Sequence, residues 1–136
     1  MEMRFRLVGR FVLSAILLVA GIGHFRSTAE FTAQVPTWMP APDFVIYISG
    51  AVEIALAISL IALPKYRVTV GWIVAGFFVV IFPGNISQFI TQTNAFGLDS
   101  DAARFIRLLF QPVLVIVALW STGAWQKFRL SRKAST

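Results

Sequence analysis

Long apolar runs alternate with short polar segments along this chain of 136 residues. The runs predict helices over about residues 7–25, 44–63, 68–91 and 105–123, and the uncharged part of the first begins at Phe11. A helix crosses the hydrocarbon core of a bilayer with about 20 residues, and its backbone groups must pair within the segment. The pattern therefore predicts an all-α integral membrane protein, a single four-transmembrane-helix domain folded as an up-down bundle.

Composition agrees with lipid as the main solvent, since 57% of the residues are hydrophobic and 13% are charged. Soluble domains carry about 25% charged residues. The chain has no cysteine and one histidine, His24. These counts exclude thiol chemistry, a bis-histidine haem and a histidine-rich metal site within the chain. No basic patch interleaves with exposed aromatic residues, so we expect no nucleic-acid partner.

The first run admits two interpretations. Arg4, Arg6 and Arg10 precede a short apolar core, as in a signal peptide. The Gly-Ile-Gly sequence at 21–23 is a poor cleavage site, however, and a polar residue follows it. We therefore expect a retained helix.

The distribution of basic residues predicts the orientation. In a four-span arrangement nine basic residues fall on one side, and three, Arg26, Arg104 and Arg107, fall on the other. The nine are Arg4, Arg6, Arg10, Lys65, Arg67, Lys127, Arg129, Arg132 and Lys133. The positive-inside rule then places both termini in the cytoplasm. Residues 124–136 form a basic cytoplasmic tail, and its expected partner is anionic membrane lipid.

The first outer loop contains a short interfacial segment. Residues 29–35 have helical character, with Phe31 and Val35 on one face. The prolines of 36–42 then break the helix, and Trp38 suits the membrane interface. The loop either tethers two helices or covers an outer cavity as a lid.

Polar residues within the spans lie at similar depths. Glu53 falls about 15 Å below the outer surface, and the polar residues of the other spans lie in the same outer half. A charged side chain at the centre of a membrane helix costs about 2.5–3.5 kcal/mol. Glu53 therefore needs a partner, and His24 and Arg107 are the candidates. Polar stripes turn inward, so we expect a common ligand-binding site. Its predicted residues are His24, Glu53, Asn85, Gln88, Arg107 and Gln111.

Two prolines adjoin this layer. Pro83 precedes Asn85 by two residues, and Pro112 follows Gln111. Kinks at these prolines would open space for a ligand. Alternatively, the amide side chains satisfy the freed carbonyl groups and the polar core is a sealed network.

Five short segments together resemble the DoxX and DoxX-like membrane proteins. They are GIGHF at 21–25, VPTWMPAP at 35–42, SGAVEI at 49–54, FPGN at 82–85 and RLLFQP at 107–112. The resemblance covers roughly residues 7–125. It implies a small four-helix protein of the bacterial inner membrane, and it carries over His24, Glu53, Asn85, Arg107 and Gln111 as polar positions. It also implies a link to quinone-coupled redox complexes with a partner protein.

The leading hypothesis is an accessory protein that binds a small amphipathic molecule, a quinone or a lipid, in a polar cavity. We expect no cofactor within the chain itself, and a quinone is the one candidate for a bound cofactor. One alternative is an oxidoreductase subunit that handles quinone with a redox partner protein. Another is a scaffold or assembly factor with a sealed polar core. Catalytic residues are not identified, and Ala51, Ala55 and Ser59 form a small-residue row suited to helix packing or a homodimer.

Overall fold

The computed structural model describes all 136 residues and contains only helices and loops. Four helices, α1, α3, α4 together with η1, and α5, are long and apolar enough to cross a membrane. The elements are α1 (Glu2–Arg26), α2 (Thr28–Thr32), α3 (Pro42–Ala62), the 3₁₀ helix η1 (Pro64–Tyr66), α4 (Arg67–Ile90), α5 (Asp101–Ser121) and α6 (Ala124–Ala134).

Several helices differ in their bounds from the predicted ones, and α5 begins at Asp101, four residues earlier than predicted. Helix α1 begins before residue 7, because nothing in its first turns breaks a helix and Arg6 pairs with Glu2 at 2.6 Å. Helix α2 ends at Thr32, earlier than predicted, because Pro36 disfavours helical backbone at the residue before it. The tail after Gly123 is itself helical, and that glycine turns the chain with a φ of 76°.

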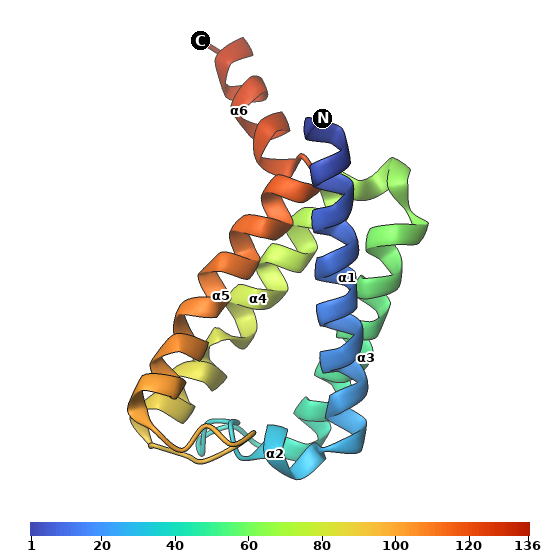
Figure 1. Cartoon of the computed structure of the whole chain (residues 1–136). Coiled ribbons are helices and arrows are strands. Elements are labelled where there is room, and N and C mark those ends of the chain that lie inside the picture. The colour runs from blue at the N-terminus through green and yellow to red at the C-terminus, as the bar shows by residue number, and fades with distance from the viewer.

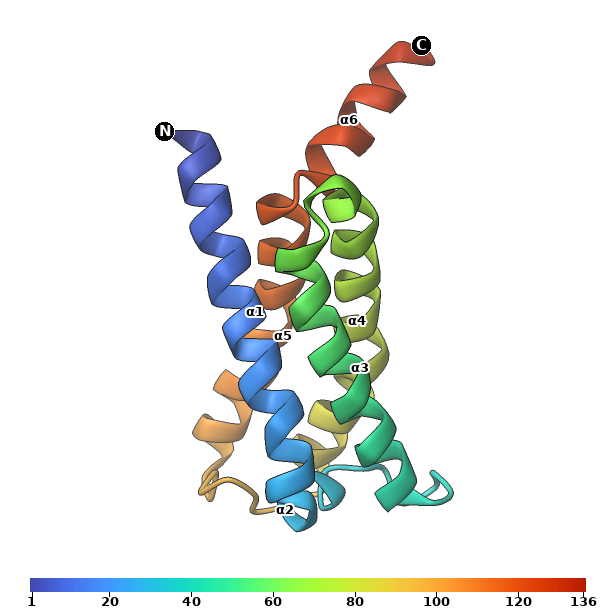
Figure 2. The ribbon, with the colours of Figure 1, turned by 90° about the vertical axis from the view of Figure 1, so that its right-hand side faces the viewer.

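The long helices form two pairs, α1 with α3 and α4 with α5 (Figures 1 and 2). Both chain termini and η1 lie at one end of the molecule, called here the terminal end. The segments 27–41 and 91–100 lie at the opposite end, the loop end. The two pairs approach each other at the terminal end and diverge toward the loop end (Figure 1).

Apolar side chains fill the contact between the pairs on the terminal side of the divergence. Leu13, Leu17, Leu60 and Val74 are fully buried there, and the cluster extends to α5. Helices α4 and α5 continue through Pro83 and Pro112. The small residues Ala51 and Ala55 stay exposed on the outer side of α3, so they do not pack against another helix of this chain.

Candidate functional site

A cavity of about 410 Å³ occupies the space where the helix pairs diverge. All four long helices contribute to its wall, and α2 with the segment after it covers the loop end of the cavity through Phe31, Val35, Pro36 and Met39. Most lining side chains are apolar. The polar lining residues are His24, Gln34, Ser49, Glu53, Asn85, Arg107 and Gln111.

One wall carries an acid and an imidazole. Glu53 on α3 is 4% exposed, and its Oε2 lies 3.2 Å from Nδ1 of His24 on α1. The same Nδ1 lies 2.8 Å from the carbonyl oxygen of Ala20, and the imidazole ring stacks on Phe31 with centroids 3.8 Å apart. No donor is aligned on the buried Oε2 of Glu53. The carboxyl group therefore keeps unused capacity for a hydrogen bond.

Two glycines bring this acid and imidazole together. A Cβ on Gly50 would lie 2.7 Å from Cβ of His24 and 3.0 Å from the carbonyl oxygen of Gly21. A Cβ on Gly21 would lie 2.9 Å from the carbonyl oxygen of Gly50. Only glycine fits this crossing of α1 and α3, because a side chain at either position would push the helices apart.

The facing wall carries a chain of hydrogen bonds. Arg107 donates from Nη2 to Oε1 of Gln34 at 2.8 Å and from Nε to Oδ1 of Asn85 at 3.3 Å. Asn85 donates to Oε1 of Gln111 at 2.9 Å, and Gln111 donates to the carbonyl oxygen of Phe78 at 2.9 Å. These bonds join α4 to α5 and tie the turn after α2 to α5.

Five of the six predicted site residues line the cavity, namely His24, Glu53, Asn85, Arg107 and Gln111. Gln88 does not line the cavity, in contrast to its predicted place among the site residues. It is 1% exposed and donates to the carbonyl oxygen of Thr93 at 3.3 Å, so it fixes the chain that leaves α4. Of the two predicted partners of Glu53, His24 is the one in contact.

Arg104 also lies outside the cavity lining, although its spacing in the sequence places it on the same helix face as Arg107 and Gln111. Its guanidinium donates to Oδ1 of Asn94 at 2.8 Å, to the carbonyl oxygen of Leu98 at 3.0 Å and to Oδ1 of Asp101 at 2.8 Å. It therefore holds the 91–100 segment against the start of α5.

Gln34 is the site residue that the sequence did not reveal. It lies in the turn after α2, is 7% exposed, and its Nε2 is buried without an acceptor. Gln34 is the polar residue that the covering segment adds to the cavity wall. Its spacing of three residues from Phe31 was the only available signal, and an irregular segment gives such spacing little weight.

Comparison with known proteins places the chain in a family without assigning an activity. The chain belongs to the family described as "Domain of unknown function (DUF8561)", whose model matches residues 13–122. The matched residues run from the first half of α1 to the end of α5 and include the whole cavity wall. No curated protein and no solved structure matches the chain.

Proposed function

We propose that this DUF8561 protein is an integral membrane protein that binds a small amphipathic molecule, a lipid or a quinone, in the cavity between its helix pairs. In this proposal α1, α3, α4 and α5 cross the bilayer as an up-down bundle with both termini in the cytoplasm. The outward faces of these helices support insertion. Val19, Val80 and Ile90 are 72%, 75% and 71% exposed, and water would be an unfavourable solvent for such faces.

The shape and lining of the cavity support an amphipathic ligand. Its volume falls within the range of about 300–1,000 Å³ that small-molecule sites occupy. Apolar residues of α1, α3 and α4 offer room for a hydrocarbon portion, and polar groups on opposite walls offer contacts for a head group. The lining residues Trp38 and Val80 are 73% and 75% exposed. They support a mouth between α3 and α4 through which a ligand enters from the bilayer.

The single observation that carries this proposal is the pair of unused polar atoms in the cavity. Oε2 of Glu53 is buried without an aligned donor, and Nε2 of Gln34 is buried without an acceptor. Unsatisfied buried polar groups each cost about 1–3 kcal/mol. A head group with one hydroxyl and one neighbouring oxygen acceptor would satisfy both. A quinol or a hydroxyl-bearing lipid offers this combination, whereas an oxidised quinone offers acceptors alone.

One observation supports the scaffold alternative. The bonds from Gln34 through Arg107, Asn85 and Gln111 to Phe78 form an unbroken network that needs no ligand. The oxidoreductase alternative rests on the DoxX-like resemblance and stays a prediction. A redox protein that co-purifies with this chain would favour it.

The test is ligand retention by the purified full-length protein. The protein is extracted from membranes in mild detergent, and native mass spectrometry identifies any small molecule that stays bound. We expect a bound lipid or quinone in the wild type and at least a ten-fold lower occupancy in Glu53→Gln. Asp99→Asn is the matched control, because Asp99 is exposed and makes no side-chain hydrogen bond. A wild-type cavity free of any small molecule would refute the proposal and favour the sealed core.

A further inference from the structure

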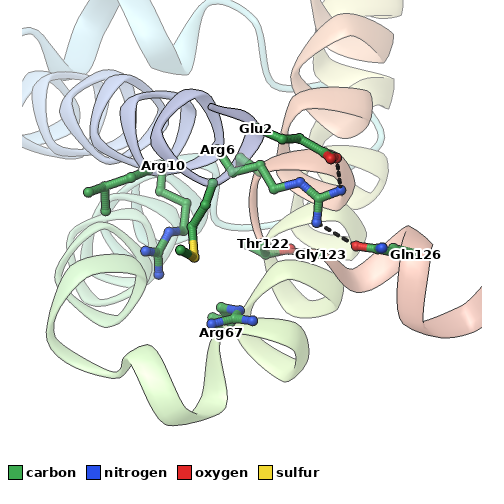
Figure 3. A pocket seen from close by; sticks show the side chains of 10 residues that line it. Glu2, Arg6, Arg10, Arg67, Thr122, Gly123 and Gln126 are labelled. Carbon is green, nitrogen blue, oxygen red and sulfur yellow. Dashed lines mark hydrogen bonds and ion pairs between the residues drawn. The ribbon is translucent and has the colours of Figure 1, made fainter.

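A second, smaller pocket of about 180 Å³ lies at the terminal end, away from the ligand cavity. The first turns of α1, the start of α4 and the junction between α5 and α6 surround it. Only two of its ten lining residues are hydrophobic. Figure 3 shows the guanidinium groups of Arg6, Arg10 and Arg67 around the backbone of Thr122 and Gly123.

The pocket has more positive charge than its own carboxylate balances. Glu2 is the one acid among the lining residues, and it pairs with Arg6 at 2.6 Å. Arg6 also donates to Oε1 of Gln126 at 2.7 Å, while its Nε is buried without an acceptor. Arg10 and Arg67 make no hydrogen bond or ion pair with any residue of the chain.

Two guanidinium groups that face each other without an anion between them repel. Arg10 and Arg67 are close enough for their charges to interact, and they come from different helices. Arg10 is partly buried and Arg67 is exposed, so solvent screens part of this repulsion. An anion between the two groups would turn repulsion into two attractive contacts.

Other donors of the pocket have no partner either. Ser121 is 2% exposed, and its Oγ is buried without a hydrogen-bond partner. Gly123 lines the pocket and precedes the first residue of α6, a helix of 11 residues. The first amide groups of a helix lack acceptors within it, and the helix dipole places positive potential there. A tetrahedral oxyanion fits this set of hydroxyl, amide and guanidinium donors.

We infer that the pocket between α1, α4 and the α5–α6 junction is a binding site for a phosphate group. Arginine favours phosphate because its planar guanidinium donates two parallel hydrogen bonds to two oxygens. The phosphate comes either from the head group of an anionic phospholipid or from free inorganic phosphate. This site is separate from the proposed ligand cavity and does not depend on it.

The test measures binding of two probes to the full-length protein in detergent by isothermal titration calorimetry. The probes are dihexanoyl phosphatidylglycerol and inorganic phosphate. The variant Arg10→Gln/Arg67→Gln removes the two unpaired charges. The control Arg4→Gln/Lys65→Gln removes two charges from neighbouring positions of α1 and η1 that do not line the pocket. We expect the pocket variant to bind at least ten-fold more weakly than wild type and the control to stay within about two-fold.

The outcomes separate the two sources of phosphate. Lipid binding that inorganic phosphate cannot displace assigns the site to a head group, and phosphate binding on its own or by displacement assigns it to the free ion. Arg10→Lys/Arg67→Lys keeps the charge and should recover part of the affinity, and circular dichroism checks the helix content of each variant. Equal affinity of the pocket variant and the control for both probes, or no binding by wild type, would overturn the inference.

Discussion

Replacement of Glu53 by leucine is expected to make the folded protein more stable, although the residue lies at the centre of its candidate site. The structure gives the reason. Oε2 of Glu53 has no aligned donor, and the one side chain within ion-pair distance of it, His24, also contacts the carbonyl oxygen of Ala20 at 2.8 Å. After the substitution His24 keeps that contact, so no new unsatisfied group is created.

The magnitude follows from two opposing terms. A charged side chain at the centre of a membrane helix costs about 2.5–3.5 kcal/mol. A hydrogen bond between membrane helices contributes about 0.6 kcal/mol on average and about 1.7 kcal/mol at most. Loss of the contact with His24 is therefore smaller than the cost that leucine removes. We expect Glu53→Leu to raise the free energy of unfolding by about 1–3 kcal/mol.

The assay is denaturant unfolding of the purified protein in detergent micelles, followed by far-ultraviolet circular dichroism. Asn85→Leu is the matched comparison on the facing wall of the cavity. Asn85 accepts from Arg107 at 3.3 Å and donates to Gln111 at 2.9 Å, so its removal leaves one buried and one partly buried group without these partners. We expect this variant to lose about 1–3 kcal/mol for each of them.

If Glu53→Leu raises the unfolding free energy and Asn85→Leu lowers it, Glu53 is a residue kept for function and Asn85 is one that holds the helices together. A protein commonly gives up stability where a group serves binding. If Glu53→Leu instead lowers the free energy of unfolding by more than about 1 kcal/mol, the carboxyl group is structural and the reasoning fails.

Three further results are expected. Gly50→Ala should lower the unfolding free energy by about 1–3 kcal/mol, because its Cβ would lie 2.7 Å from Cβ of His24. The control is Gly76→Ala, where a Cβ meets nothing within 4 Å, and it should leave the unfolding free energy unchanged or raise it by about 0.5–1 kcal/mol. Equal changes of the unfolding free energy in the two glycine variants would contradict a tight α1–α3 crossing. Arg104→Gln removes three hydrogen bonds and should speed amide hydrogen exchange in the 91–100 segment; an unchanged rate would show that these bonds do not order it. Trp38→Ala should release a bound ligand faster with stability within about 0.5 kcal/mol of wild type, and an unchanged release rate would place the mouth elsewhere.

The helices could be predicted from the sequence because each apolar run has the length and composition of a helix that can cross a membrane. Their ends could not, since they depend on local contacts. The Glu2–Arg6 pair stabilises the first turn of α1, so this helix starts earlier than predicted. The proline after α2 keeps that helix short. Helical periodicity also placed Glu53 and Asn85 on inward faces correctly.

Two side chains show where the sequence is insufficient for the site. Gln88 shares a helix face with Asn85 but lies one turn closer to the end of α4, where the carbonyl oxygen of Thr93 takes its donor. Periodicity gives the direction of a side chain and leaves its level along the cavity undetermined. Gln34 lies in a turn without periodicity, and only the folded chain shows that it reaches Arg107.

The position of the cavity follows from the way each helix pair is held together. The close contact of Gly21 with Gly50 joins α1 to α3, and the bond from Asn85 to Gln111 joins α4 to α5. Across the cavity, the side-chain hydrogen bonds between the pairs run through the segment after α1. Arg107 donates to Gln34, and the amide of Phe96 donates to Oε2 of Glu30 at 2.6 Å. The separation of the two pairs at the loop end therefore depends on this segment. A head group that contacts Glu53 on one wall and Gln34 beside the other would add a further bridge to those that this segment makes.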